Sequence, residues 1–449
     1  MRCDAHRREG RVDDHHHTRN ASGHPDRPYD AADLSSKAFW SQTPQQREDT
    51  FAQLRAERPV SWHPPFEDQL IDDPGDHGFW AIVGYDDLVE VTKRHEDFLS
   101  GHGILLESLP PELIENAQSI IAMDPPRHTK MRRLVASAFT PKQMRRIQDR
   151  IEANAKLVVD HLIKQAAASA DGVVDFATEC AALLPMHNIS DIVGVPNGQR
   201  QRAAEEAAVG TGWNDPELVG HTKQEVLTRL FQAQVSLHEI ASNLAGERRE
   251  NPTDDLTTAL ALAEIDGERL TDAEIGSFFV LLTIAGNDTT RQSTAHGLKA
   301  LTDHPEQRAW LLEDLPERIG PAAEELVRWA TPIMTFRRTA ARDLEFRGQQ
   351  ITAGDKVVLF YSSANRADAS IERATSWTWP VTSTCTSASA AAARDPPLPG
   401  QPARPLPAPR PVHRAAHTRP AHRVDRRARA DPRQLLQPGQ ARPCRLNLD

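Results

Sequence analysis

The stretch from Leu270 to Ala300 reads LTDAEIGSFFVLLTIAGNDTTRQSTAHGLKA and predicts one long helix. Thr271 with Glu274 three residues later has the spacing of a capping box, and no proline interrupts the stretch. At about 1.5 Å per residue it would span roughly 45 Å, the width of a whole domain. Its centre is apolar nearly all round, which is typical of a helix in the middle of a large protein.

The centre of this predicted helix also carries polar residues, in the run Ala285-Gly-Asn-Asp-Thr-Thr290. A glycine in a helix interior costs up to about 1 kcal/mol, and an acid and a hydroxyl follow it at core depth. Two interpretations are open from these residues alone. Either Gly286 serves close packing and Asp288 makes a buried ion pair, or a ligand lies against the helix or opens it locally.

The composition indicates a chain without a membrane span. Hydrophobic residues make up 39% of it and the mean hydropathy is -0.55, and its longest apolar run is far short of the roughly 20 residues that a span needs. The charged N-terminus has no apolar segment, so we expect no signal peptide and a cytoplasmic location. The cysteines lie far apart and predict neither a disulfide framework nor a zinc site; they are Cys3, Cys180, Cys385 and Cys444.

The net charge of -10 conceals two regions of opposite charge. From Ala374 to Asp449 there are 12 Arg, no Lys, 4 Asp and no Glu, a net +8, so residues 1–373 carry -18. This tail also holds 13 of the 33 prolines and no Phe, Tyr, Ile or Met. Such a composition cannot build a core. We therefore predict a disordered leader at 1–29, a folded body at 30–371 and a disordered tail at 372–449.

Hydrophobic patterns predict a body that is mainly helical with a small β region. Strands are expected at 78–84 and in the short runs between glycine turns at 335–361. Helices are expected over these ranges: 36–57, 86–94, 144–166, 176–192, 199–209, 223–249, 304–312 and 320–330.

Two further stretches carry charged residues at helical spacing. In DPPRHTKMRR, at 124–133, two prolines can start a helix, and His128 and Arg132 lie four residues apart on one face. That pair suits an anionic group, although a solvated basic face gives the same pattern. Glu325 and Arg328, three residues apart, can pair within one turn, but such a pair alone is weak evidence of function.

The order of these strings, with FRRTA at 336–340, closely resembles the cytochrome P-450 family over about residues 32–366. The resemblance implies the cytochrome P-450 fold, mainly α with a small β region, and here incomplete at the C-terminus. It implies that Arg338, rather than Arg337, contacts a haem propionate. The other matching positions are Ala285 and Gly286 in the oxygen and substrate pocket, Asp288 and Thr289 in proton relay, His128 and Arg132 at a propionate, and Glu325 and Arg328 in a buried structural pair.

The resemblance fails where the family supplies the cysteine thiolate that ligates the haem iron and favours O–O cleavage. The family's loop FGxGxHxCxG is absent, and neither Cys385 nor Cys444 lies in a similar glycine-rich setting. We therefore assign no metal ligand. If the gene is GC-rich, the codons that encode residues 372–393 can be read two bases out of frame. This shifted reading permits an amino-acid sequence that ends in FGVGGG. Our hypothesis is an insertion or deletion before about Glu372 and a second near Ala393.

The family's reaction is monooxygenation with haem b, in which one oxygen atom of O2 enters an apolar substrate. Electrons come from NAD(P)H through a ferredoxin reductase and ferredoxin. The motif details resemble most the bacterial soluble branch that acts on terpenoids, sterols and fatty acyl chains. Without the cysteine loop we expect this chain to be inactive or impaired.

Three other readings remain open. The chain could be a haem-free remnant that binds an apolar ligand, a nonfunctional pseudogene product, or a chain that misfolds. A basic tail can bind nucleic acid, but this one lacks lysine and has only two aromatic residues, so we expect no nucleic-acid partner.

Overall fold

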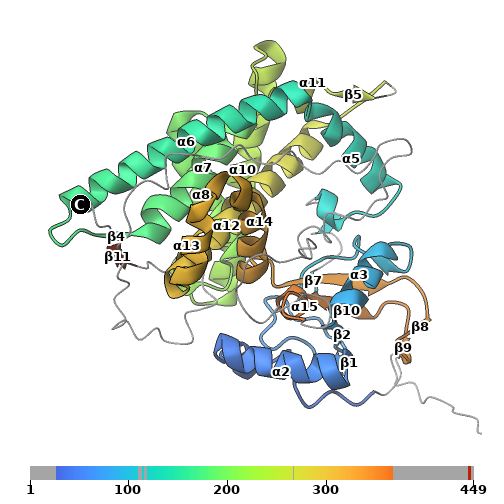
Figure 1. Cartoon of the computed structure of the whole chain (residues 1–449). Helices are drawn as coiled ribbons and strands as arrows, with labels where there is room; N and C mark the ends of the chain where they lie inside the picture. Colours follow the sequence, from blue (N-terminus) through green and yellow to red (C-terminus); the bar gives the residue numbers. More distant parts are fainter. Residues whose placement is uncertain (1–26, 110–113, 116–118, 266, 368–442, 446–449) are drawn as a thin grey trace, which may run out of the picture.

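The computed structural model describes residues 27–109, 114–115, 119–265, 267–367 and 443–445. Figure 1 shows a large helical part, with α12 near its middle and the long α6 across one side, and a smaller β part beside α2 and α3. The prediction of a mainly helical fold with a small β region is confirmed for these residues. Residues 368–442 and 446–449, where the fold was predicted to be incomplete, lie outside the described residues.

The helices agree with the sequence patterns to within a few residues in most cases. The α-helices are α1 (Lys37–Trp40), α2 (Pro44–Glu57), α3 (Tyr85–Lys93), α5 (Arg127–Ala138), α6 (Pro141–Ala168), α7 (Leu183–Val193), α8 (Arg200–Thr211), α9 (Pro216–Val219), α10 (Lys223–Glu250), α11 (Leu256–Leu262), α12 (Asp272–Asp303), α13 (Pro305–Glu313), α14 (Leu315–Ala330) and α15 (Tyr361–Ala364). Short 3₁₀ turns are η1 (Ile120–Ala122) and η3 (Asn197–Gln199), and η2 (Ala177–Ala182) is a π-helical turn that leads into α7.

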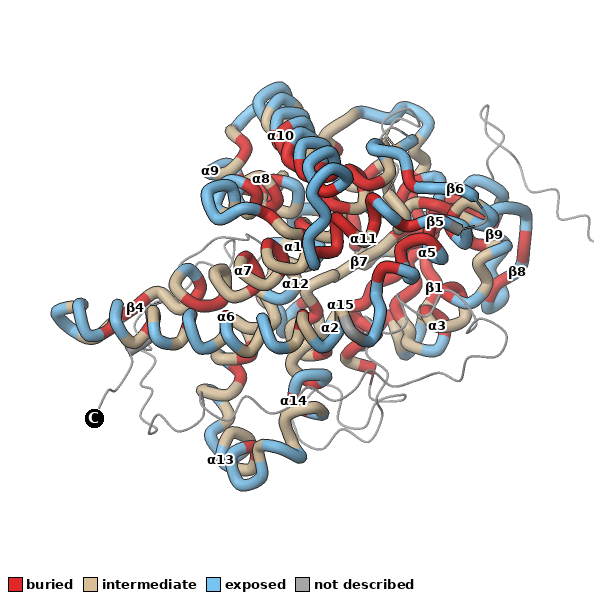
Figure 2. The backbone as a smooth tube through the Cα atoms, turned by 90° about the horizontal axis from the view of Figure 1, so that it is seen from above, coloured by how far each residue is buried: buried red, intermediate tan, exposed pale blue. Residues whose placement is uncertain are grey.

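The central helix α12 begins at the predicted capping box. The Thr271 hydroxyl accepts a hydrogen bond from the Glu274 backbone N–H at 3.2 Å, and the Glu274 carboxylate accepts one from the Thr271 N–H at 2.9 Å. This pairing satisfies two backbone donors that a helix start leaves open. From there α12 contacts α7, α8, α10 and α14, so its apolar residues become a shared core. Figure 2 shows the matching pattern on α10, which is buried on one side and exposed on the other.

The main sheet has five strands in the order β1-β2-β10-β7-β3. In this sheet β2 and β10 pair in parallel, and the other neighbouring strands pair antiparallel. Chain segments more than 250 residues apart therefore lie side by side in it. The strands are β1 (Val60–His63), β2 (Phe79–Ile82), β3 (Phe98–Leu99), β7 (Thr335–Ala340) and β10 (Lys356–Phe360), with smaller pairs β4 (Val173–Asp175) and β11 (Pro443–Arg445), β5 (Glu264–Ile265) and β6 (Glu268–Arg269), and β8 (Leu344–Phe346) and β9 (Gln349–Ile351).

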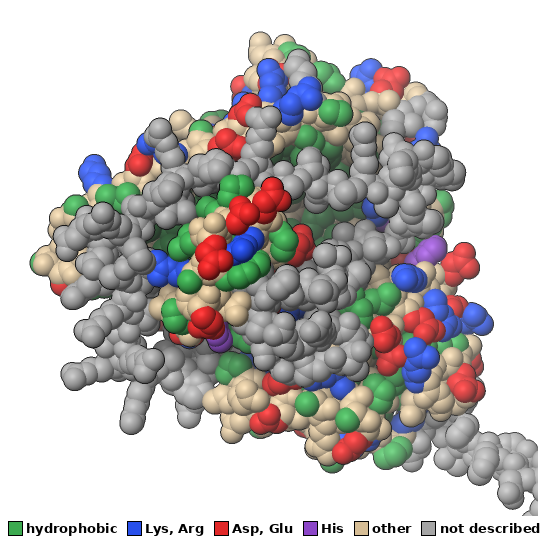
Figure 3. All heavy atoms as spheres, viewed as in Figure 1, with side chains coloured by type: hydrophobic (Ala, Val, Ile, Leu, Met, Phe, Trp, Pro, Cys, Tyr) green, Lys and Arg blue, Asp and Glu red, His purple; other side chains and the backbone are tan. Residues whose placement is uncertain are grey.

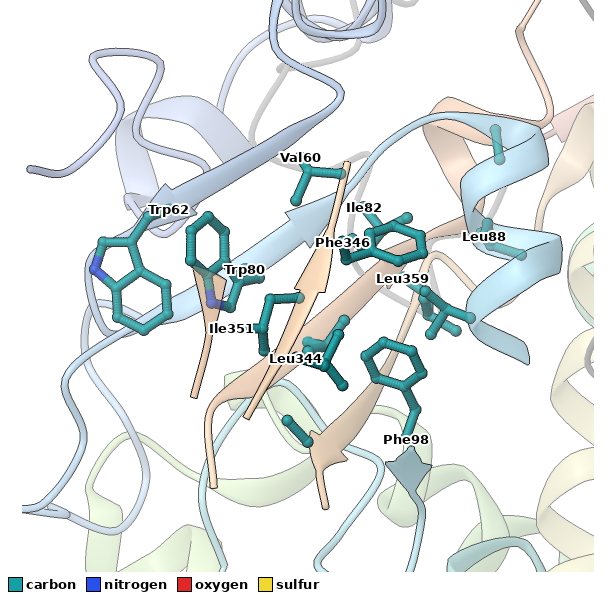
Figure 4. Close-up of a cluster of buried hydrophobic side chains, with 14 of the residues drawn as sticks. Val60, Trp62, Trp80, Ile82, Leu88, Phe98, Leu344, Phe346, Ile351 and Leu359 are labelled. Atoms are coloured by element: carbon teal, nitrogen blue, oxygen red, sulfur yellow. The ribbon is translucent and has the colours of Figure 1, made fainter. Parts of the chain in front are cut away.

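The sheet is covered on both faces by apolar side chains. Figure 4 shows one of these clusters, in which residues of β1, β2 and β10 meet Phe98 and the hairpin residues Leu344, Phe346 and Ile351. The other face packs against α1 and α2 through Phe39, Phe51 and other apolar residues. Outside the cluster, charges of both signs are interspersed on this part of the surface (Figure 3). One example is Arg347, which forms ion pairs with Asp87 and Glu90 of α3.

Parts of the predicted leader and tail lie among the described residues. Arg27 and Tyr29, which fall in the predicted leader, make hydrogen bonds to residues of the body. Pro443–Arg445, which fall in the predicted tail, form β11 antiparallel to β4. The rest of both segments lies outside the described residues. Strands β1 and β3 were not predicted from the sequence; they have only four and two residues.

Among the described residues, no helix is long and apolar enough to cross a membrane. The same residues contain no group of three or more His, Cys, Asp or Glu side chains arranged to hold a metal ion.

His63 of β1 makes folding sensitive to acid. Its ring is completely buried, its Nδ1 accepts a hydrogen bond from the Leu34 N–H at 3.2 Å, and its Nε2 lies 2.8 Å from the Ser61 hydroxyl. Burial disfavours the charged ring and lowers the pKa of His63 from 6.5 to about 4. The unfolded chain binds a proton here below about pH 6.5, whereas the folded chain does not until about pH 4.

The free energy of unfolding should therefore fall by up to about 3 kcal/mol between pH 6.5 and pH 4 through this residue alone. Urea denaturation of His63→Gln over this range should show a shallower pH dependence than that of the wild type. His221→Gln, at an exposed histidine, is the control and should keep the wild-type slope. Equal slopes for wild type and His63→Gln would contradict the assignment.

Candidate functional site

The middle of α12 is open on one side although the helix lies at the centre of the molecule. Ala285 is exposed, and the residues from Gly286 to Thr289 are only partly buried. One turn earlier, Phe279, Val280 and Thr283 are buried. Small and polar residues in the middle of this central helix are thus less covered by the rest of the protein than the turn before them. A ligand that covered this open side would contact Ala285 and its neighbours.

Hydrogen bonds within α12 keep this region helical. The Thr289 hydroxyl donates to the Ala285 carbonyl at 2.7 Å, and the Asn287 amide donates to the Thr283 carbonyl at 2.8 Å. The helix is continuous from Asp272 to Asp303. The local opening of the helix, which the sequence left open as one way to accommodate a ligand, is therefore not observed. The Asn287 side-chain oxygen is buried without a hydrogen-bond partner, and an atom of this kind leaves hydrogen-bonding capacity inside the site.

Asp288 lies in a largely desolvated environment. Burial raises the pKa of its carboxyl above the ordinary value, and this effect is opposed by the charge of Arg291 and a hydrogen bond with Gln292. A carboxyl of this kind takes up and releases a proton closer to neutral pH than an exposed aspartate does. Next to the Thr289 hydroxyl, it gives the site one acidic and one hydroxyl group in adjacent positions.

Gly286 has a packing role that is visible in the structure. A Cβ atom added there would lie 2.2 Å from Cδ1 and 2.7 Å from Cγ1 of Ile189, which is on α7. The glycine therefore lets α12 and α7 approach closely, as one of the two interpretations of the sequence expected. This observation does not test the role in the oxygen pocket that the resemblance implies.

Gly286→Ala should destabilise the protein by about 1–3 kcal/mol, because Ile189 must leave its position in the core. The control is Gly246→Ala in α10, where an added Cβ meets nothing within 4 Å. That change should stabilise the protein by up to about 1 kcal/mol through helix propensity. Chemical denaturation measures both. Adding Ile189→Ala to Gly286→Ala should cost less than the sum of the two single changes, and strict additivity would contradict the contact.

A small cavity is lined by two of the predicted anion-binding residues. His128, on α5, and Arg338, on β7, both line it, and both are buried. Its other lining residues include Ser100, Asp124 and Met123. Arg132, one helical turn after His128, is exposed and does not line this cavity. The structure thus places His128 and Arg338 on one cavity and Arg132 outside it, and the propionate roles of all three stay predictions.

The two arginines of FRRTA have different surroundings, because successive residues of a strand point to opposite faces. The Arg338 side chain reaches the cavity with His128, and its Nη1 donates to the Arg337 carbonyl at 2.7 Å. The Arg337 guanidinium instead donates to the carbonyls of His102, Gly103 and Glu107. Arg337 therefore holds a loop, and Arg338 is the residue whose position suits an anionic group.

Glu325 and Arg328 form a buried pair, as the resemblance implied. Two hydrogen bonds of 2.6 Å join the guanidinium to the carboxylate, and both side chains are at most 3% exposed. Arg328 also donates to the Asn365 carbonyl at 2.6 Å. The Asn365 amide donates in turn to the Thr331 hydroxyl at 2.9 Å. Helix α14 is thereby tied to the segment that follows β10 and α15.

Asn365 and Arg366 are structural residues that the sequence analysis did not identify. Arg366 donates to the Trp329 carbonyl at 2.8 Å and lies 4.3 Å from the centre of its ring. Burial, and then the charge of Arg328, lower the pKa of Arg366 to about 10. Two polar residues directly after the short buried helix α15 are the signal that could have indicated a tertiary contact.

Glu325→Gln should destabilise the protein by about 3–5 kcal/mol, because it leaves the Arg328 charge buried without its counter-ion. Asp303→Asn is the control, since Asp303 pairs with Lys299 on the exposed part of α12, and should cost less than about 1 kcal/mol. Urea denaturation compares the two. A loss below 1 kcal/mol for Glu325→Gln would show that the pair is not part of a rigid core.

Two of the four cysteines lie among the described residues. Cys180 belongs to η2 and packs with Val158, Leu162, Ala166 and Val174. Cys444 lies in β11 opposite Val174. Cys3 and Cys385 lie outside the described residues.

These features together, a central helix with AGNDTT, an α5–β7 cavity and a buried Glu–Arg pair, define a haem monooxygenase type of fold. The sequence matches the cytochrome P450 family over residues 73–371, most of the chain. The chain belongs to that family.

Individual relatives of this chain are monooxygenases or other cytochromes P450. A methyl-branched lipid omega-hydroxylase of Mycobacterium tuberculosis is 38% identical over 360 residues, which cover 80% of this chain and 81% of the relative. A steroid C26-monooxygenase of Rhodococcus jostii is 37% identical over 70% of this chain and 64% of the relative. A solved cytochrome P450 of Mycobacterium marinum in complex with pseudoionone is 55% identical over 78% of this chain and 83% of that one, with a TM-score of 0.73. The monooxygenase class predicted from the sequence is confirmed at the level of the family.

Proposed function

We propose that residues 27–367 form the body of a monooxygenase that inserts one atom of O2 into an extended apolar lipid. The observation that carries this proposal is the open face of α12, where Ala285 is exposed at the centre of the molecule beside the desolvated Asp288. An apolar substrate could lie there, shielded by the helices around α12. The two curated relatives, a methyl-branched lipid hydroxylase and a steroid monooxygenase, favour the lipid class over smaller substrates.

The residues beside the open face and in the α5–β7 cavity suit a haem group. Haem would supply the iron chemistry that activates O2. His128 and Arg338 would hold a propionate in their shared cavity, and Arg132 at the exposed end of the same helix face would contact it from the solvent side. Ala285 and Gly286 would leave room beside the iron. No described residue fits the axial thiolate, so we derive no step that depends on it.

Proton delivery is the task that suits Asp288 and Thr289. The raised pKa of Asp288 allows its carboxyl to hold a proton inside the protein and to pass it on. In this structure the Thr289 hydroxyl donates a hydrogen bond to the Ala285 carbonyl at 2.7 Å. If it rotated from that carbonyl toward the open face, it would present a hydroxyl proton there. Electrons would come from NAD(P)H through a ferredoxin reductase and ferredoxin.

We further propose that the chain in its present reading frame is impaired, because residues 372–449 are out of frame. The family match ends at residue 371, which is where the composition changes to Arg, Pro and Ala. Every motif of the site that matches the family lies before this point. The reading of this chain as a haem-free protein that binds an apolar ligand predicts a different spectrum, so one measurement separates the two.

The test is the carbon monoxide difference spectrum of the reduced, purified chain, with its haem content measured in parallel. We expect no Soret band at the long wavelength typical of thiolate ligation. A chain whose gene has both proposed insertions or deletions corrected, the one before about codon 372 and the one near codon 393, should show that band and oxidise an apolar lipid. The control is the same gene restored but with the new cysteine changed to serine.

Each other result has a definite meaning. A thiolate band from the unrestored chain would show that Cys385 or Cys444 reaches the iron and would overturn the frame proposal. Failure of the restored chain to bind haem would overturn the proposed function. Binding of an apolar ligand without haem by both chains would favour the haem-free alternative.

A further inference from the structure

The two tryptophans of the sheet form an aromatic surface that holds a cation. Trp62 of β1 and Trp80 of β2 are directly opposite in register, with ring centres 5.2 Å apart and ring planes at 60° (Figure 4). The guanidinium carbon of Arg27 lies 5.0 Å from the centre of the Trp62 ring and 5.1 Å from that of Trp80. Cations are attracted to the faces of aromatic rings, most strongly to tryptophan. One arginine therefore interacts with both rings.

The polar side of this site is already oriented for a guanidinium. Oδ2 of Asp355 accepts hydrogen bonds from the Trp80 indole N–H at 3.0 Å and from the Thr352 N–H at 2.8 Å. The same oxygen accepts from Nη1 of Arg27 at 2.7 Å, and the Asp355 side chain is 1% exposed. Nη2 of Arg27 donates to the Thr352 hydroxyl at 2.6 Å and to the Gln350 carbonyl at 3.0 Å. Thus both terminal nitrogens of Arg27 have defined acceptors.

We propose that these groups form a guanidinium-binding site that fastens the N-terminal segment to the sheet. The site consists of the Trp62 and Trp80 rings, the Asp355 carboxylate, the Thr352 hydroxyl and the Gln350 carbonyl, and Arg27 occupies it. The proposal is independent of haem and of the reading frame of the tail.

Two further contacts show where the fastened segment runs. The Tyr29 hydroxyl donates to the His77 carbonyl at 3.1 Å, and the Asp30 N–H donates to the Trp62 carbonyl at 2.7 Å. Trp62, His77 and Asp355 also line a cavity beside the sheet. Residues 27–30, which we call the strap, therefore run beside residues that line that cavity. Arg27 is the first described residue that attaches the strap to the sheet.

The site should prefer a guanidinium to an ammonium group. A guanidinium is planar, so it can stack against an indole while its in-plane N–H groups reach separate acceptors. Lysine would bring one compact charge, which can meet the carboxylate but cannot satisfy the Thr352 and Gln350 oxygens in the same geometry. Arg27→Lys should thus retain only part of the effect.

The experiment is hydrogen–deuterium exchange on the full chain, followed at peptides that cover residues 27–35, 60–63 and 350–356. Arg27→Ala should accelerate exchange at all three by about tenfold, consistent with a partly desolvated cation–aromatic contact. Adding ethylguanidinium, at concentrations far below those that denature, should restore slow exchange at 350–356 in Arg27→Ala. It should not restore 27–35, because the free ligand is not attached to the strap.

The matched control is Arg342→Ala, which removes a more exposed arginine that pairs with Asp97 and contacts neither tryptophan. It should leave the three peptides unchanged and show no response to ethylguanidinium. Unchanged exchange in Arg27→Ala would overturn the proposal. So would equal rescue by ethylammonium, since it would mean that the site recognises charge and not the guanidinium shape. If Arg27→Ala does not fold, Arg27→Lys with the same two ligands gives the same discrimination.

Discussion

The buried pair of Glu325 and Arg328 is the interaction on which the arrangement of the body depends. It is not an isolated ion pair, because Arg328 also donates to the Asn365 carbonyl. That third bond connects α14, and through it α12, to the end of the segment that leaves the sheet. A charge buried this deeply is tolerated only when its partners are fixed. The helical part and the sheet are therefore held in one relative position by groups that lie 37 residues apart in sequence.

The sheet then sets the positions of the candidate site residues. β7 pairs with β10 along its whole length, and this register places Arg338 opposite Val357 and Arg337 opposite Val358. One arginine faces the cavity with His128, and its neighbour holds the carbonyls of the loop from His102 to Glu107. The same strand thus separates two tasks by alternation. A shift of one residue would exchange them, so the strong register of a sheet buried on both faces is a functional constraint as well as a structural one.

Much of this arrangement could be predicted from the sequence, and the reasons for the limits are physical. The capping box at Thr271 and the long apolar run of α12 are local signals, and both were identified. The Arg337 loop contacts, the Asn365 bond and the Arg27 site join residues more than 30 positions apart, and no local pattern encodes such distances. His128 and Arg132 illustrate the same limit: helical spacing places them on one face, but only packing decides that His128 is buried beside Arg338 while Arg132 stays exposed.

The division of the chain between body and tail follows from where these contacts end. Arg366 is the last residue whose side chain closes a described hydrogen bond inside the body, to the Trp329 carbonyl. Among the described residues, the main sheet, the α5–β7 cavity and the open face of α12 are built only from residues before that point. An error in the reading frame after residue 371 would therefore remove the ligand to the iron while leaving the residues proposed for the propionates, for oxygen and for proton transfer in place. On this proposal, the match to the family before residue 371 and the absence of the family's cysteine loop after it concern separate parts of the chain.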